Sequence, residues 1–212
     1  MLLPHGAHGE SGSQPRLADA LYQSPEDGGA RRWEVVADSA TLHAAPGASV
    51  IEDLGRGAVL SNMGCSKKAA DLWCHVRPFR GGQPGFVRAD RLAPAEGPDG
   101  ITPVGVDDSR RRAGRGDFDA SGRVPCAQER GQALGQCKLG VSRGQGGDAT
   151  LVATFPNGFA RRLFFVHGVF ISASATMSGV GRDVDWRLED GTHLIRVDDQ
   201  RFEIPNALIF GE

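Results

Sequence analysis

The chain has no excess of charge of either sign and no long hydrophobic segment. Among its 212 residues, 24 basic side chains stand against 26 acidic ones, for a net charge of −2. No overall positive field is therefore available to attract nucleic acid or an anionic membrane. The longest apolar stretch, RRLFFVHGVFISA at 161–173, is interrupted by His167 and Gly168 and is too short to cross a bilayer. We expect neither a nucleic-acid partner nor a transmembrane segment.

Catalytic and cofactor motifs are also missing from the sequence. It contains no nucleophile elbow, no HExxH and no glycine-rich phosphate loop between a strand and a helix. The acidic residues Asp183, Asp185, Glu189 and Asp190 lack the spacing of a calcium loop. His193 lies among apolar residues, where a structural histidine is commoner than a ligand. We expect no enzymatic activity, no cofactor and no metal site.

The N-terminal stretch MLLPHGAHGESGSQ at 1–14 has neither a basic start nor the apolar core that a signal peptide requires. The cysteines nevertheless indicate an oxidising compartment. We expect either that a leader was removed or replaced, or that translation starts upstream.

The four cysteines form two local pairs, Cys65 with Cys74 and Cys126 with Cys137. Zinc sites usually show tighter spacing or interleaved histidines, and a catalytic cysteine is usually single with a histidine as base. Zinc, redox chemistry and reduced thiols remain alternatives, but an even number of nearby cysteines favours two short-range disulfides. Each would stabilise its domain by ~2–3 kcal/mol and would place the chain in the periplasm or outside the cell.

The 30 glycines and 12 prolines predict many turns and few long helices. Residues 1–31 are rich in Gly, Ser, Pro and Ala and predict a flexible tail. Residues 95–117 are dense in Gly, Pro and charge and predict an interdomain linker. Two compact all-β segments remain, at 32–94 and 118–212.

The first segment shows short alternating strands separated by Gly/Pro turns, which predict a small antiparallel barrel. Its order of motifs resembles the bacterial Src-homology-3-like domain family: a strand with a proline, a Leu-x-x-Gly turn, a tryptophan strand, a Gly-aromatic-Val strand and a terminal leucine. The residues that carry this resemblance are Leu42, Pro46, Leu54, Gly57, Leu60, Trp73, Val76, Gly85, Phe86, Val87 and Leu92. The sequence departs from the family at Phe86, where a tryptophan is usual, at its Thr41-Leu42-His43 opening, and in having Cys65 and Cys74 around a long mid-domain loop.

The resemblance implies a binding groove between the first long loop and the tryptophan strand. Its aromatic or polar wall would be formed by Trp73, Phe86, His43 and Phe79, since aromatic faces bind extended peptides or glycan stems well. The alternative is that Trp73 and Phe86 fill the interior of the barrel.

The second segment contains clear hairpin signals. Asp190-Gly191 and Asp198-Asp199 fit two-residue turns. Folding on them pairs Trp186 with Ile195, Val184 with Val197, Leu188 with His193, Ile195 with Phe202, and His193 with Ile204, all on one face. Asn157-Gly158 and His167-Gly168 indicate further turns. We expect five or six strands in a meander from Thr150 to Ile204, forming a barrel or sandwich whose entry loop is held by Cys126 and Cys137.

Together these features predict a non-enzymatic, two-domain envelope protein that binds peptidoglycan, its peptides, or another envelope protein as an accessory subunit. One alternative is a periplasmic inhibitor of a wall-degrading hydrolase, because the C-terminal half, with its serine-rich SASATMSG at 172–179, resembles lysozyme-inhibitor barrels in shape. A hydrolase that uses the first barrel for targeting is a third interpretation.

Overall fold

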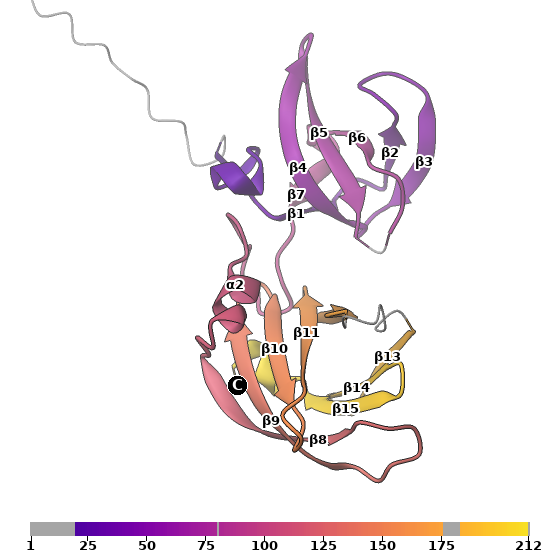
Figure 1. Ribbon diagram of the computed structural model, residues 1–212. Coiled ribbons are helices and arrows are strands. Elements are labelled where there is room, and N and C mark those ends of the chain that lie inside the picture. The colour runs from indigo at the N-terminus through magenta and orange to yellow at the C-terminus, as the bar shows by residue number, and fades with distance from the viewer. Residues whose placement is uncertain (1–19, 80, 176–182, 212) are drawn as a thin grey trace, which may run out of the picture.

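The computed structural model describes residues 20–79, 81–175 and 183–211. This part of the chain is mostly β-structure in two antiparallel sheets (Figure 1), which confirms the predicted all-β fold class. The first sheet has the strand order β3-β2-β6-β5-β4-β1-β7. Its strands are β1 (Arg32–Val35), β2 (Ser39–His43), β3 (Val50–Gly55), β4 (Val59–Lys68), β5 (Asp71–Pro78), β6 (Gly85–Arg88) and β7 (Leu92–Pro94), with the 3-10 turns η1 (Pro25–Asp27) and η2 (Ala89–Arg91).

The core of the first sheet follows from the alternation of its strands. Trp33, Leu42, Val76 and Val87 are fully buried, while the residues next to them in sequence are mostly more exposed. Successive strand residues point to opposite faces, so each strand contributes every second side chain to one apolar cluster. Trp33, rather than Trp73, is the large side chain that fills this interior.

Residues 20–31 belong to this first unit, so the prediction of a flexible tail over 1–31 is wrong for its last part. The Tyr22 ring stacks on Trp33 with centroids 5.1 Å apart. The backbone N–H of Cys65 donates to the Tyr22 carbonyl at 3.0 Å, and the Asn62 side chain donates to the Ala30 carbonyl at 2.7 Å. These contacts bury Ala30 completely.

Cys65 and Cys74 are joined by a disulfide across the β4–β5 hairpin, where they are directly opposite each other. The prediction that they enclose a long loop is therefore wrong. The chain between them continues as paired strand up to a tight turn at Ala69, which has a φ of +54°. The disulfide thus fixes two neighbouring strands rather than restraining a loop.

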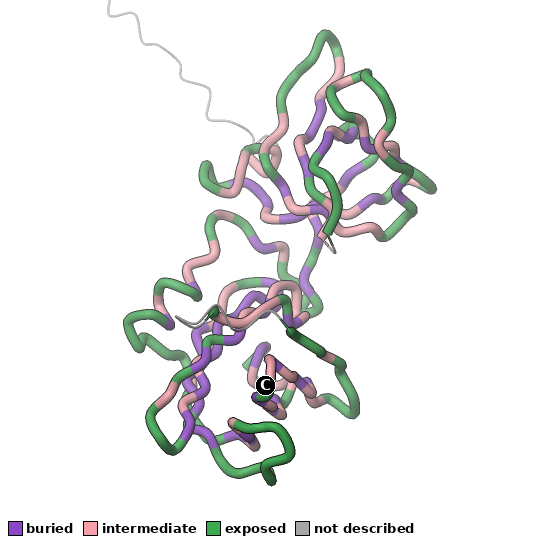
Figure 2. Tube along the Cα trace, turned by 45° about the vertical axis from the view of Figure 1, so that its right-hand side comes forward, coloured by how far each residue is buried: buried purple, intermediate pink, exposed green. Residues whose placement is uncertain are grey.

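The second sheet has eight strands in the order β12-β11-β10-β9-β8-β15-β14-β13. They are β8 (Ala120–Ala127), β9 (Gly135–Arg143), β10 (Ala149–Thr154), β11 (Ala160–Val166), β12 (Val169–Ala173), β13 (Val184–Glu189), β14 (Thr192–Val197) and β15 (Gln200–Pro205), followed by α3 (Ala207–Phe210). Side chains from both ends of this order contribute to one apolar cluster, so the sheet curls around a single core (Figures 1 and 2).

The prediction of one continuous meander from Thr150 to Ile204 is only half right. The expected six strands are present, but β12 and β13 stand at opposite ends of the sheet order. The strands β13–β15 are joined to the strands β8–β12 by β15, which pairs with β8 at Phe202 and Cys126. Cys126 and Cys137 form a disulfide that joins β8 to β9 directly, so it does not hold an entry loop.

The predicted register of the C-terminal hairpins is confirmed. Trp186 pairs with Ile195 and Leu188 with His193, and the β14–β15 pairs also agree. Asp190 and Asp198 adopt positive φ values of 46° and 53°, as the tight turns require.

The predicted linker at 95–117 is packed against the protein over much of its length. Its helix α2 (Ser109–Gly114) covers β9 and β10, and the Ser109 hydroxyl lies 2.9 Å from that of Thr150. Val104 forms a β-bridge with Ala30, next to the first sheet. The segment has the Gly- and Pro-rich composition of a linker because it consists mainly of turns and contains no long helix or strand.

A buried charge cluster joins the two sheets. The Asp148 carboxylate, 2% exposed, accepts hydrogen bonds from Arg32 and, at 2.8 Å, from Arg31. It also accepts the backbone N–H of His167 at 2.9 Å. Arg31 immediately precedes β1 and Arg32 is its first residue. Asp148 and His167 lie in turns of the second sheet. The carboxylate therefore connects both halves of the chain.

Candidate functional site

The outer face of the first sheet brings four rings together. Trp73 and His75 alternate along β5 with the core residues Cys74 and Val76, and so point away from the core. His75 pairs with Phe86 on β6, and Phe86 pairs with His43 on β2. Three adjacent strands therefore place these rings side by side. We refer to His43, Trp73, His75 and Phe86 as the aromatic face.

The rings of the aromatic face contact each other in two pairs. His43 meets Trp73 edge to face with centroids 5.4 Å apart, and His75 stacks on Phe86 at 4.7 Å. The His43 Nδ1 atom is also 2.8 Å from the carbonyl oxygen of Ala48, which holds the ring in place. Such contacts orient the rings in advance, so little conformational entropy is lost when a ligand binds.

Three of the four predicted binding residues meet on this face. Trp73, Phe86 and His43 are together, and none of them belongs to the apolar core cluster. Trp73 is nonetheless buried, with only 7% of its surface exposed.

Phe79 does not join the aromatic face. It follows the end of β5, and its ring lies 5.9 Å from that of His167 in the second sheet. There it lines an apolar cleft of about 380 Å³ together with Leu60, Pro78 and Val169. The prediction grouped it with Trp73 because sequence proximity does not reveal that the strand has already ended.

His75 is the member that the sequence analysis missed. Neighbouring strand residues face opposite sides, so His75 points away from the side of Cys74. The same alternation places it beside Trp73, two residues away, so the signal was present in the sequence.

A hollow of about 600 Å³ lies beside His75 and Phe86. Its other walls come from β4, at Met63 and Ser66, and from the segment 23–27 that packs on the sheet. The carboxylate of Asp27 accepts a 2.9 Å hydrogen bond from the Ser24 hydroxyl on this wall. Part of the site therefore comes from residues that composition alone assigns to a tail.

A second, smaller hollow of about 210 Å³ lies beside His43 and is lined by Arg88 and Arg91. Arg88 donates two hydrogen bonds to the carboxylate of Asp90, and this contact lowers the pKa of Asp90. The hollow at His43 thus contains two arginines, both near the Asp90 carboxylate, and the hollow at His75 contains an acidic residue.

The remaining histidine candidates have structural surroundings. His193 is completely buried, accepts a 3.0 Å hydrogen bond from the Trp186 indole and lies 2.9 Å from the Asn206 side-chain oxygen. Burial lowers its pKa, as it lowers that of His167. Within residues 20–79, 81–175 and 183–211, no cluster of three or more His, Cys, Asp or Glu side chains could hold a metal ion.

Among residues 20–79, 81–175 and 183–211, no helix is long and apolar enough to cross a bilayer. Half of the serine-rich stretch that motivates the inhibitor interpretation, residues 176–179, lies outside the described residues. Comparison with models of protein families, with curated proteins and with solved structures found no match.

Proposed function

We propose that this chain is a non-enzymatic binding protein of the bacterial cell envelope, periplasmic or secreted, whose first sheet is an Src-homology-3-like barrel. Both cysteine pairs form disulfides, and such bonds persist mainly in oxidising compartments. The order of strands and turns along 32–94 supports the barrel assignment. The ligand is an extended peptide, from peptidoglycan or from another envelope protein.

The aromatic face is the single observation that carries this proposal. His43, His75 and Phe86 line the two hollows, and the largely buried Trp73 packs edge to face against His43 outside the apolar core cluster. Rings held in fixed orientations offer a large contact area at low entropic cost, which is why binding surfaces are rich in them.

The charges around the aromatic face favour one orientation of a bound peptide. A ligand lying across the rings would meet Arg88 and Arg91 at one end and Asp27 at the other. An anionic group near the arginines and a cationic group near the carboxylate would complement both hollows. Complementary charges at the ends orient a ligand, while the buried rings between them supply most of the affinity.

A pull-down with the full chain tests the proposal, using purified sacculi in one arm and a detergent extract of the envelope in the other. Phe86→Ala removes a half-buried ring from the aromatic face. An anchor of this kind contributes about 2 kcal/mol, so we expect roughly thirtyfold weaker retention. Phe79→Ala is the matched control, because it removes the same ring outside the face.

Retention of the wild type and of Phe79→Ala, with loss for Phe86→Ala, would support the proposal. If the wild type bound to neither sacculi nor extract, or if both variants bound as well as the wild type, the assignment of this face would be wrong.

A further inference from the structure

Two cations face each other on the outer side of the second sheet. Arg123 on β8 is directly opposite Lys138 on β9, and Thr154 on β10 is opposite Lys138 on its other side. Their sequence neighbours Val124 and Cys137 are buried in the core, so Arg123 and Lys138 point outward and are exposed.

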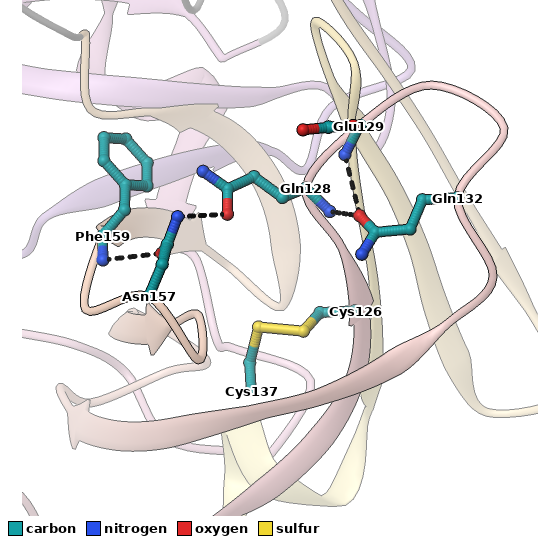
Figure 3. The surroundings of a disulfide bond; sticks show 7 residues. All are labelled: Cys126, Gln128, Glu129, Gln132, Cys137, Asn157 and Phe159. Atoms are coloured by element: carbon teal, nitrogen blue, oxygen red, sulfur yellow. Dashed lines mark hydrogen bonds between the residues drawn. A yellow bond between two sulfur atoms is a disulfide. The ribbon is translucent and has the colours of Figure 1, made fainter.

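This arrangement is unfavourable unless an anion is present. Like charges directly opposite each other destabilise a sheet. The strands cannot separate to relieve the repulsion, because the Cys126–Cys137 disulfide joins β8 to β9 (Figure 3) and Cys137 immediately precedes Lys138. The disulfide therefore keeps the two cations opposite each other.

The pair also differs from most other cations of the chain. Arginines elsewhere are mostly ion-paired, as Arg112 is with Asp117 and Arg196 with Asp183. Neither Arg123 nor Lys138 has a carboxylate within ion-pair distance in the part of the chain that the structure describes. Both charges are available to a ligand.

A pocket of about 300 Å³ surrounds the pair. Its lining comprises Arg123, Gln136, Lys138, Thr154, Phe155, Pro156 and Gly158. The β10–β11 turn that forms one wall is held in place where the Asn157 amide donates to the Gln128 side-chain oxygen at 2.8 Å (Figure 3). The pocket thus combines two cations with an amide, a hydroxyl and an apolar proline ring.

We propose that this pocket binds an acidic sugar, meaning a phosphate or carboxylate on a hydroxylated ring. The guanidinium and ammonium groups bind the anion, since both form charge-assisted hydrogen bonds with such oxygens. Gln136 and Thr154 are suited to ring hydroxyls, and the volume is at the small end for a ligand site. A peptide fits less well, because β9 and β10, which carry Lys138 and Thr154, are each paired on both sides and offer no strand edge there.

The proposal is tested by calorimetry on the full chain with galacturonic acid, glucose 1-phosphate and inorganic phosphate, and with a triglutamate peptide and a short DNA duplex for comparison. The variant Arg123→Ser/Lys138→Ser removes both cations. Lys67→Ser/Lys68→Ser is the matched control, since it removes two exposed charges from the first sheet. We expect at least one acidic sugar to bind more tightly than phosphate, with at least tenfold loss in the first variant and none in the second.

The unliganded Arg123→Ser/Lys138→Ser variant should unfold at the same temperature as the wild type or higher, because a repulsion has been removed. Unfolding at a lower temperature would contradict the premise of the proposal. Equal binding of phosphate and acidic sugars, tighter binding of the peptide or the duplex, or unchanged binding in the variant would overturn it. The pocket shares no residue with the aromatic face, so this result is independent of the proposed function.

Discussion

Replacing Asp148 by asparagine should destabilise the whole chain severely. The Asp148 carboxylate is the partner of two arginines, Arg31 and Arg32, and the Arg32 side chain is only 4% exposed. Burial lowers the pKa of Arg32, while the charge of Asp148 opposes that shift. Losing the carboxylate charge would leave a buried guanidinium without compensation.

The magnitude follows from the burial of both partners. Removing one member of a buried ion pair costs about 3–5 kcal/mol, a large share of the 5–15 kcal/mol typical of a folded protein. The Nη1 atom of Arg32 already has no hydrogen-bond partner among the described residues, so it has no alternative acceptor nearby. We therefore expect Asp148→Asn near the upper part of this range.

Urea unfolding followed by circular dichroism measures the effect. Asp38→Asn is the matched control, because Asp38 pairs with Arg56 in full contact with solvent and its loss should hardly move the midpoint. The double variant Arg32→Met/Asp148→Leu should recover part of the lost stability, since apolar residues replace the buried Arg32–Asp148 pair at little cost while Arg31 keeps the Asp107 carboxylate 3.9 Å away. If Asp148→Asn lowered stability no more than Asp38→Asn, the cluster would not be what holds the two sheets together.

Three further predictions concern stability. Replacing Cys126 and Cys137 by serine should lower the free energy of unfolding by ~2–3 kcal/mol; an unchanged urea midpoint would show that the disulfide adds nothing. Burial lowers the pKa of both His167 and His193 below the usual 6.5, so the unfolded chain takes up protons that the folded chain does not. Stability should be at its plateau above about pH 7.5 and fall as the pH drops below 6.5; a midpoint that rises toward pH 5.5 would contradict this. In Gly85→Ala, the new Cβ atom would lie 2.6 Å from a backbone carbonyl oxygen of β2, so we expect a loss of about 1–3 kcal/mol, and a wild-type midpoint would be the contrary result.

The parts of the fold that were predicted correctly depend on local signals. The register of β13, β14 and β15 follows from two-residue turns at Asp190 and Asp198 and from a period of two, so a shift by one residue would have exposed the apolar set. The disulfide partners followed from their spacing. These features need no information about distant parts of the chain.

The features that were missed depend on long-range contacts. The pairing of β15 with β8 joins Phe202 to Cys126, and no local pattern specifies it. Residues 20–31 have the composition of a tail, and only the stacking of Tyr22 on Trp33 shows otherwise. The opposition of Arg123 and Lys138 likewise appears only once the hairpin register is known.

The aromatic face itself was partly predictable. Alternation places Trp73 and His75 on the same side of β5, but Phe86 and His43 reach them only through the order of β5, β6 and β2 in the sheet. Phe79 could not be separated from this group without knowing where β5 ends.

The aromatic face is tested most directly by the imidazole signals of the chain in a proton NMR titration. Soluble peptides released from sacculi are added in one experiment and a detergent extract of the envelope in another. We predict that one of the two shifts the signals of His43 and His75 and leaves that of the buried His193 unchanged. If neither addition moves His43 or His75, the ligand does not bind on this face.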